Sequence, residues 1–385
     1  MGQIKILFGL EATEGGAAKH LTYLATNLRK ELFDITVIVS HHRSVLFKSD
    51  VLRMQARGVR VINIPMQRNI NPLNDLYALV KIYYHIKNEK YDIVHAHSSK
   101  AGILFRVAAF LNRRPAIAYT PHCFYFQAYV GYFKFFYLYI EKLVAKFTDS
   151  IITVSSSEKD IAIREGIASV ETIECIVNAI DLNEYHQLQE STAIRQNYNI
   201  TSTGPIIASI GRLTRQKDLL TYIHAAQVVL KTYPDAVFLI VGKGELHNKL
   251  RKTIDDLNLE QQVILTGEVK DIHQIYNIID LLVNTSLWEG LPYVILEAML
   301  FKRPVVATKV SGNQDIVIDG KTGYLAPQKN YELVAKAIEK ILSNKSLANE
   351  MGKEGHKTLK KKFIFDNFIS AHESLYKGLV ESRLE

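Results

Sequence analysis

The chain has 385 residues, of which 48% are hydrophobic and 22% are charged. This composition is typical of a soluble globular protein and leaves room for two domains with separate cores. The two cysteines, Cys123 and Cys175, exclude a disulfide framework and a cysteine metal cluster, which suits a reducing cytoplasm. The N-terminus enters a strand without the basic and apolar regions of a signal peptide, so we expect a cytoplasmic protein.

Positive charge is concentrated in the N-terminal half. Residues 1–180 contain 22 Lys and Arg against 15 Asp and Glu, a net charge of +7, whereas the remainder contains 25 against 24. This asymmetry predicts an anionic partner for the N-terminal half, which would be a membrane surface, a phosphorylated acceptor or nucleic acid. No nucleic-acid-binding motif accompanies the charge, so we expect no nucleic-acid partner.

The N-terminal half alternates strands with helices. Apolar runs predict strands over residues 4–8, 34–40, 59–64, 92–95, 117–120 and 150–154. Such alternation with short loops favours a parallel sheet that is covered on both faces. Gly15 and Gly16 follow the first strand, and glycines there let backbone N–H groups approach a ligand closely. The pair is not part of a G-x-G-x-x-G sequence, so no dinucleotide site is predicted.

Histidines lie at the ends of two of these strands. His95 and His97 are two positions apart, and we expect their side chains to leave opposite faces of the strand, which is poor geometry for one metal ion. We therefore predict structural or loop roles for them. His97, Ser98 and Lys100 belong to a polar loop that opens a helix. His122 follows the next strand at its carboxyl end, where parallel sheets bind ligands.

Aromatic residues are concentrated between Phe124 and Phe147. A transmembrane helix normally needs ~20 apolar residues with few charges. Gln127, Lys134, Glu141 and Lys142 interrupt this run, so we reject a membrane span. Two interpretations remain open, namely a helix packed in the domain core and a helix lying partly in a membrane interface, where aromatics and lysines are favoured.

The C-terminal half repeats the alternating pattern after a polar segment. A predicted strand over residues 206–210 is followed by a glycine turn that carries Arg212 and Lys217. An Arg fork and a Lys point charge are the usual partners of a diphosphate. The strand over residues 236–241 ends in a second glycine turn, which contains Gly242 and Gly244.

Two glutamates eight positions apart, Glu289 and Glu297, follow a buried strand predicted over residues 280–283. Pro292 suits the first turn of a helix, which we predict over residues 293–300. This arrangement places Glu289 on a loop at the carboxyl end of a strand, where open parallel sheets bind ligands. The helix start favours a diphosphate, and the carboxylates would accept hydrogen bonds from the hydroxyls of an attached sugar and ribose.

Several of these segments resemble motifs of the retaining glycosyltransferases of family 4. The resemblance covers nearly the whole chain, and some positions depart from the usual pattern: Ala18 stands in place of Glu, Cys123 and Ala179 in place of Gly, and Asp218 in place of Gly. The matching segments are E-x7-E at 289–297, G-R-L-x-x-x-K at 211–217, G-G-A at 15–17, T-P-H at 120–122 and N-A-I-D at 178–181.

The resemblance implies an α/β protein of the GT-B architecture, with two Rossmann-like parallel-sheet domains facing across a cleft. The N-terminal domain over residues 1–180 would bind the acceptor, and residues 181–204 would form a linker. The C-terminal domain over residues 205–364 would bind the nucleotide-sugar donor. Residues 365–385 would form a last helix that crosses back to the N-terminal domain.

The resemblance also implies transfer of a sugar, with retention, from a nucleoside-diphosphate sugar to a polysaccharide or lipid-linked glycan acceptor. A UDP-sugar is favoured as donor, and an anionic membrane is a further expected partner at the inner face of the cell membrane. The chain contains no D-x-D, so we expect neither a metal nor another cofactor. Two alternatives are a nucleotide-sugar epimerase of the same fold and a non-catalytic nucleotide-sugar-binding protein.

The resemblance assigns candidate roles to three groups of residues. The catalytic candidates are His122, Arg212, Lys217 and Glu289. The donor-binding candidates are Gly15, Gly16, Arg212, Lys217, Gly242, Gly244, Glu289, Gly290, Leu291, Pro292 and Glu297. The acceptor-binding candidates are His97, Ser98 and Lys100.

Overall fold

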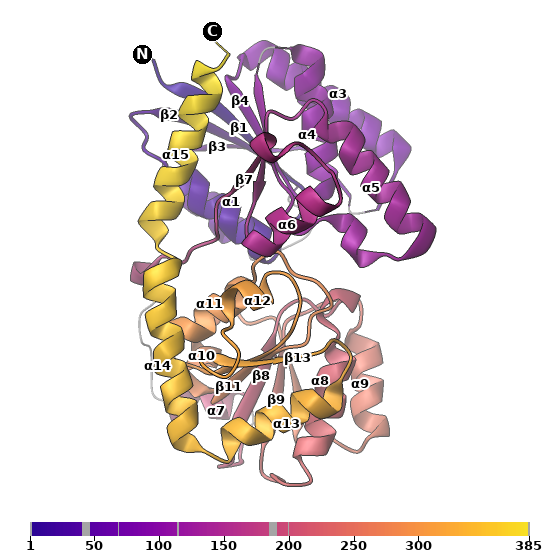
Figure 1. The fold of residues 1–385 in the computed structure, drawn as a ribbon, viewed down its shortest axis with the longest axis vertical. Coiled ribbons are helices and arrows are strands. Elements are labelled where there is room, and N and C mark those ends of the chain that lie inside the picture. The colour runs from indigo at the N-terminus through magenta and orange to yellow at the C-terminus, as the bar shows by residue number, and fades with distance from the viewer. Residues whose placement is uncertain are drawn as a thin grey trace. The chain divides into compact units, whose positions relative to one another are not determined.

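The computed structural model describes residues 2–40, 47–67, 69–113, 115–184, 191–198 and 200–383 (Figure 1). The chain divides into two compact units, each built around a parallel sheet. Unit 1 comprises Met1–Asn178 and Asp366–Glu385, and unit 2 comprises Ala179–Phe365. Part of the predicted linker, residues 185–190 and 199, lies outside the described residues.

The sheet of unit 1 has the strand order β3-β2-β1-β4-β5-β6-β7, and all neighbouring strands are parallel. The order reverses between β1 and β4, so the connections that follow these two neighbouring strands run to opposite sides of the sheet. Such a reversal is where open α/β sheets bind ligands. The strands are β1 Ile4–Leu10, β2 Phe33–Val39, β3 Arg60–Asn63, β4 Ile93–His97, β5 Ala116–Thr120, β6 Ser150–Thr153 and β7 Ile173–Cys175.

Helices connect the strands of unit 1, and the last helix of the chain also belongs to this unit. Two helix starts follow from N-cap residues: the side chains of Asn71 and Ser155 accept hydrogen bonds from N–H groups of the first turns of α3 and α6. The helices are α1 Gly16–Asn27, α2 Phe47–Ala56, α3 Pro72–Glu89, α4 Ser99–Asn112, η1 Tyr125–Ala128, α5 Gly131–Ala145, α6 Ser156–Arg164, η2 Val170–Thr172 and α15 Phe365–Glu381.

Helix α15 is fixed to unit 1 by buried polar contacts. The Glu373 carboxylate accepts hydrogen bonds from the backbone N–H and the Nε of Arg29, at 3.0 and 2.7 Å. The hydroxyl of Tyr376 lies 2.8 Å from Nδ1 of His95 on β4. Both Glu373 and Tyr376 are buried, so these contacts hold the end of the chain against the middle of the sheet.

The sheet of unit 2 has the order β10-β9-β8-β11-β12-β13, again with parallel neighbours, and it reverses between β8 and β11. The strands are β8 Ile206–Ile210, β9 Val237–Val241, β10 Val263–Gly267, β11 Leu281–Asn284, β12 Val305–Thr308 and β13 Gly323–Ala326. The helices are η3 Leu182–Glu184, α7 Ser191–Asn197, η4 Arg215–Lys217, α8 Leu219–Val229, α9 His247–Asp256, α10 His273–Ile278, α11 Tyr293–Leu300, α12 Asn313–Ile316, α13 Tyr331–Leu342 and α14 Lys345–Lys362.

Every strand expected from the sequence is present, with ends that differ by a few residues. The strand β8 and the helix α11 have the predicted bounds. The strand β4 extends to His97, so the interpretation of His97 as a loop residue was wrong. Both faces of the parallel sheets are covered, and β4, β5, β8 and β9 are accordingly buried along their whole lengths.

The aromatic run of unit 1 forms η1 and α5 and divides between the core and the surface. Phe124, Phe126 and Leu138 are buried, whereas the rings of Tyr132 and Phe135 are 78% and 67% exposed. One face of α5 therefore packs in the domain and the other does not. None of the described helices is long and apolar enough to cross a membrane.

A charged pair lies inside the hydrophobic core of unit 1. Arg106 on α4 is fully buried, and its Nη2 donates a hydrogen bond to Oε1 of Glu141 on α5 at 2.8 Å. Its Nε donates to the carbonyl of Gly102, and the Tyr119 ring lies 3.7 Å from the guanidinium carbon. The contacts of Arg106 link α4, α5 and β5. Each hydrogen bond compensates for charge that burial removes from water.

We expect Arg106→Ala to lower the free energy of unfolding by about 3–5 kcal/mol, because it leaves the Glu141 carboxylate buried without its cation. The control Glu89→Ala breaks the half-exposed pair between Arg60 and Glu89 and should cost about 0–1 kcal/mol. Urea denaturation followed by circular dichroism measures both values. Equal losses in the two variants would contradict the importance of the buried pair.

Candidate active site

The loops that follow β8 and β11 meet at the carboxyl edge of the sheet in unit 2. Lys217 ends the short helix η4 in the first loop, and Glu289 lies in the second. The Nζ of Lys217 lies 2.5 Å from Oε1 of Glu289, and both side chains are largely shielded from water. The structure therefore brings together a cation and a carboxylate that the sequence analysis proposed for one ligand.

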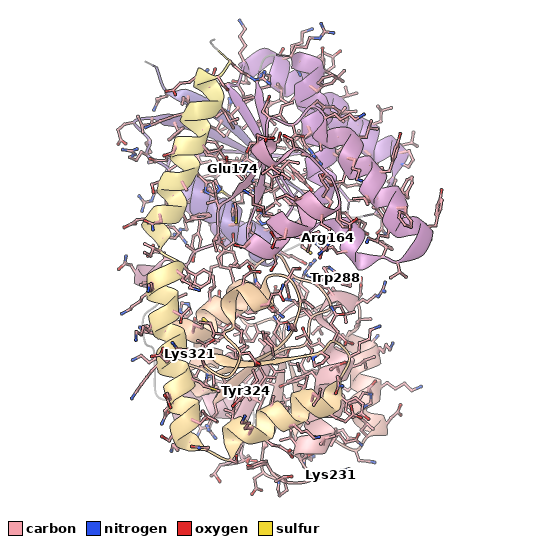
Figure 2. All side chains as sticks on the ribbon, viewed as in Figure 1. Arg164, Glu174, Lys231, Trp288, Lys321 and Tyr324 are labelled. Atoms are coloured by element: carbon pink, nitrogen blue, oxygen red, sulfur yellow. The ribbon has the colours of Figure 1, made fainter. Side chains whose placement is uncertain are left out.

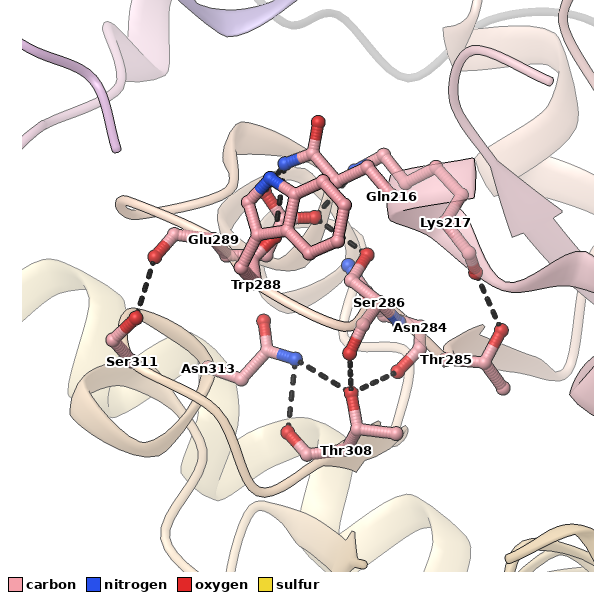
Figure 3. Close-up of polar contacts among 10 residues, drawn as sticks. All are labelled: Gln216, Lys217, Asn284, Thr285, Ser286, Trp288, Glu289, Thr308, Ser311 and Asn313. Carbon is pink, nitrogen blue, oxygen red and sulfur yellow. Dashed lines mark hydrogen bonds and ion pairs between the residues drawn. The ribbon is translucent and has the colours of Figure 1, made fainter. Parts of the chain in front are cut away.

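Neighbouring polar groups fix the Glu289 carboxylate in place (Figure 3). The Oγ of Ser286 donates a hydrogen bond to Oε1 of Glu289 at 2.6 Å. Nε2 of Gln216 lies 3.5 Å from Oε2 and donates to the carbonyl of Trp288 at 2.8 Å. These contacts hold the carboxylate beside Lys217 and leave it with acceptor capacity for ligand hydroxyls.

Buried hydrogen bonds fasten the loop of Glu289 to the strands around it. The hydroxyl of Thr308, at the end of β12, donates to the carbonyl of Ser286 at 2.5 Å, and Nδ2 of Asn313 donates to the carbonyl of Thr308 at 2.9 Å. The Oγ1 of Thr285 donates to the carbonyl of Lys217 at 2.8 Å (Figure 3). The two charged residues are consequently held by a rigid frame rather than by their own attraction alone.

Glu297 lies on α11 in a different environment from that of Glu289. It is buried, and its Oε2 accepts a hydrogen bond from the hydroxyl of Tyr276 at 2.8 Å. Burial and then the nearby Glu297 carboxylate raise the pKa of Tyr276 well above its usual value, so the hydroxyl stays protonated and donates. The sequence analysis missed Tyr276, because a single Tyr on a short helix has no motif that would mark it.

The other predicted donor residues of unit 2 lie in the same group of loops. Gly242 has a φ of 137°, and a Cβ atom there would lie 2.0 Å from the carbonyl oxygen of Gly211. The glycine therefore allows the loops after β8 and β9 to touch. The remaining predicted donor-binding residues of unit 2 are Gly244, the partly buried Arg212, and the buried residues Gly290, Leu291 and Pro292.

The structure corrects the predicted place of Pro292 and adds Trp288 and Arg215 to this region. Pro292 is the N-cap of α11 and not a residue of its first turn, because its ψ of 121° is extended. Trp288, labelled in Figure 2, is partly exposed beside Glu289, and the guanidinium of Arg215 lies 6.0 Å from its ring centroid. An aromatic ring and a cation thus lie in the two loops that carry Glu289 and Lys217.

The predicted residues of unit 1 lie at the carboxyl edge of the other sheet. Gly15 is the N-cap of α1 with a φ of 71°, a conformation that favours glycine, and Gly16 begins the helix. Ser98 is the N-cap of α4 and has a φ of 66°. The Nζ of Lys100 lies 2.6 Å from Oδ1 of Asp75, so this lysine is engaged in an ion pair.

His97 and His122 belong to a cluster of histidines in unit 1. Nδ1 of His97 lies 3.1 Å from Nε2 of His122, and the rings of His95 and His97 are 4.1 Å apart. The expectation that His95 and His97 leave opposite faces was wrong, because alternate residues of a strand share a face. Burial lowers the pKa of His122 to about 3 and that of His97 well below its usual range.

Two family models match the chain in succession. Residues 14–184 match the model described as Glycosyltransferase Family 4, and residues 190–358 match the model described as Glycosyl transferases group 1. The UDP-Gal:alpha-D-GlcNAc-diphosphoundecaprenol alpha-1,3-galactosyltransferase of Escherichia coli is 31% identical over 92% of this chain and 92% of that protein. The chain belongs to the family 4 glycosyltransferases.

Further similarities agree with this family. The capsular polysaccharide biosynthesis glycosyltransferase CapM of Staphylococcus aureus is 27% identical over 91% of each chain. The crystal structure of Anabaena Alr3699/HepE in complex with UDP and glucose has a TM-score of 0.83 at 22% identity, and covers 97% of this chain and 100% of that chain. The predicted GT-B fold and glycosyltransferase activity are thereby confirmed, and the epimerase and non-catalytic alternatives are not favoured.

Proposed function

We propose that this glycosyltransferase moves a hexosyl group from a UDP-sugar to a lipid-diphosphate-linked glycan, with retention of configuration. The observation that carries the proposal is the ion pair between Lys217 and Glu289 at the carboxyl edge of the unit 2 sheet. The E. coli relative is named for a UDP-galactose donor and a diphosphoundecaprenol acceptor, and the Anabaena structure holds UDP and glucose. Both names favour these substrates.

The proposed chemistry follows from the charges that develop during transfer. An acceptor hydroxyl forms a bond to the anomeric carbon while the bond from that carbon to the diphosphate breaks. Arg212, Lys217 and the N-terminus of α11 stabilise the negative charge on the leaving diphosphate. The hydroxyl proton passes to an oxygen of the leaving phosphate, on the face of the sugar where the new bond forms.

The two glutamates would orient the donor. Glu289 accepts hydrogen bonds from sugar hydroxyls, and Glu297, whose charge Tyr276 already supports, accepts from the ribose. Lys217 faces Glu289 before the donor arrives, and the diphosphate would then share this cation. His122 would lie beside the sugar as a further catalytic residue, and His97, Ser98 and Lys100 would border the acceptor.

Arg212→Ala and Lys217→Ala should each lower turnover by ~10²–10³-fold, because each removes a positive group that faces the developing charge. Radiolabelled sugar transfer from a UDP-hexose to a polyprenyl-diphosphate-linked acceptor measures this loss. Lys321→Ala is the control, because Lys321 forms an exposed ion pair with Glu354 elsewhere in unit 2. Near-normal turnover in both active-site variants would remove these cations from the mechanism.

Transfer should survive treatment with EDTA, because side chains and a helix terminus neutralise the donor diphosphate in this proposal. The assay is the initial rate of transfer before and after chelation, with a D-x-D-dependent glycosyltransferase as a positive control for chelation. A loss of activity that Mg²⁺ or Mn²⁺ restores would contradict the prediction.

We further propose that α5 docks unit 1 on an anionic membrane. Its outer face and the residue before it expose large hydrophobic side chains. These are Val130, Tyr132, Phe133, Phe135, Phe136, Tyr139 and Leu143. Lys142 and Lys146 lie a turn or two further along the same face, and interfacial helices combine such rings with cations.

A nearby helix of unit 1 also exposes large hydrophobic side chains. Helix α4 packs against both α3 and α5, and α3 exposes Leu73, Leu76 and Tyr77. The net charge of +7 over residues 1–180 adds attraction to anionic lipid. The lipid of a lipid-linked acceptor is inserted in the membrane, so docking would bring unit 1 to this substrate at the inner face of the cell membrane.

The double variant Lys142→Glu, Lys146→Glu should bind anionic liposomes about 30-fold more weakly at low salt, since each well-placed cation contributes ~1 kcal/mol. Lys134 is less suitable for this test, because it already pairs with Glu165 at 3.1 Å. Co-sedimentation measures binding, and a matched variant, Lys336→Glu, Lys353→Glu in unit 2, controls for net charge. No binding of the unmodified protein at low salt would exclude this docking surface and favour a soluble acceptor.

A further inference from the structure

Three imidazole rings converge at the carboxyl edge of the unit 1 sheet. His20 comes from α1, His97 ends β4, and His122 follows β5. The ring centroid of His20 lies 4.6 Å from that of His122 and 5.4 Å from that of His97. One ring nitrogen from each residue lies within 4.8 Å of the other two. Segments far apart in the sequence therefore direct nitrogen atoms to one point.

The spacing of these nitrogens suits a metal ion. Two nitrogens bound tetrahedrally to zinc at about 2.05 Å lie about 3.3 Å apart. Nδ1 of His97 and Nε2 of His122 are 3.1 Å apart. As a direct contact this pair needs a proton between the rings, whereas an ion between them would use a lone pair from each.

The third ring is already oriented for the same role. Nδ1 of His20 lies 2.8 Å from Oδ1 of Asn178, an acceptor, so Nδ1 carries the proton. Nε2 of His20 therefore has its lone pair free, and this atom is buried without a hydrogen-bond partner. A ligating histidine almost always donates its other N–H to an oxygen in this way.

Other histidines of the cluster do not fit this role. Both ring nitrogens of His95 have partners, the hydroxyl of Tyr376 and that of Thr120, each at 2.8 Å. His372 does not belong to the group whose ring nitrogens lie within 4.8 Å of one another, although its Nδ1 donates to the carbonyl of Phe368 and its buried Nε2 has no hydrogen-bond partner.

We propose that His20, His97 and His122 form a binding site for a divalent transition-metal ion, with zinc as the best match. Three neutral nitrogen ligands suit zinc and not magnesium or calcium, which prefer oxygen. Three protein ligands also leave the fourth zinc position open for water or another oxygen ligand. The ion would lie in unit 1, so it is separate from the cations that face the donor diphosphate in unit 2.

The test is a titration of the full chain, purified without a polyhistidine tag and freed of metal, with Co²⁺ and then with competing Zn²⁺. We expect one ion per chain and the intense visible absorption of four-coordinate cobalt. His97→Ala and His122→Ala should each weaken binding by at least ~100-fold, and Asn178→Ala by ~10–100-fold as the residue that orients His20. His247→Ala, which removes an exposed histidine, should bind as the unmodified protein does.

Thermal melting establishes that each variant is folded. His122 is partly exposed and so keeps the test usable if His97→Ala unfolds. No cobalt absorption in the unmodified protein would overturn the proposal. Unchanged affinity in His122→Ala would also overturn it, because the ion would then bind elsewhere. Both outcomes are independent of sugar transfer, since the readout is the metal itself.

Discussion

The candidate active site depends on one ion pair, between Lys217 and Glu289. The two residues are 72 positions apart in the sequence, and they meet because β8 and β11 are neighbours in the sheet of unit 2. The side chains are 16% and 8% exposed, so their attraction is screened less than that of a surface pair. Each charge keeps the other in position before a ligand arrives. The hydrogen bonds from Ser286 and Thr308 then determine where the pair can lie.

The two sheets follow one plan but carry different chemistry at their carboxyl edges. In unit 2 the reversal of strand order presents opposite charges, and the helix that follows the second loop, α11, carries another buried carboxylate. In unit 1 the corresponding reversal presents neutral imidazoles and glycine at the start of α1. In both units the carboxyl edge of the parallel sheet positions the polar groups, and the residues at that edge determine the chemistry. This division suits an enzyme that must bind a charged donor and a second substrate.

Local patterns predicted the alternation of strands and helices and part of the site, whereas the GT-B architecture was expected from the family resemblance. The strand over residues 206–210 and the helix over residues 293–300 follow from apolar runs, a glycine turn and a proline, all of which act within a few residues. Tyr276 and the histidine cluster could not be predicted, because their partners come from distant segments. The contact between His20 and Asn178 spans 158 positions. The wrong expectation for His95 and His97 could have been avoided from the sequence, because side chains two positions apart in a strand lie on the same face.

Helix α15 has a consequence for the order in which the chain can fold. Its contacts from Glu373 to Arg29 and from Tyr376 to His95 complete the core of unit 1, yet the whole of unit 2 precedes it in the sequence. During synthesis the ribosome releases every residue of unit 2 before unit 1 can bury these groups. Most of unit 1 is therefore translated before unit 2, but the fold of unit 1 is completed only after unit 2 has been translated. A truncation of the final twenty or so residues would damage the core of unit 1 and leave unit 2 intact.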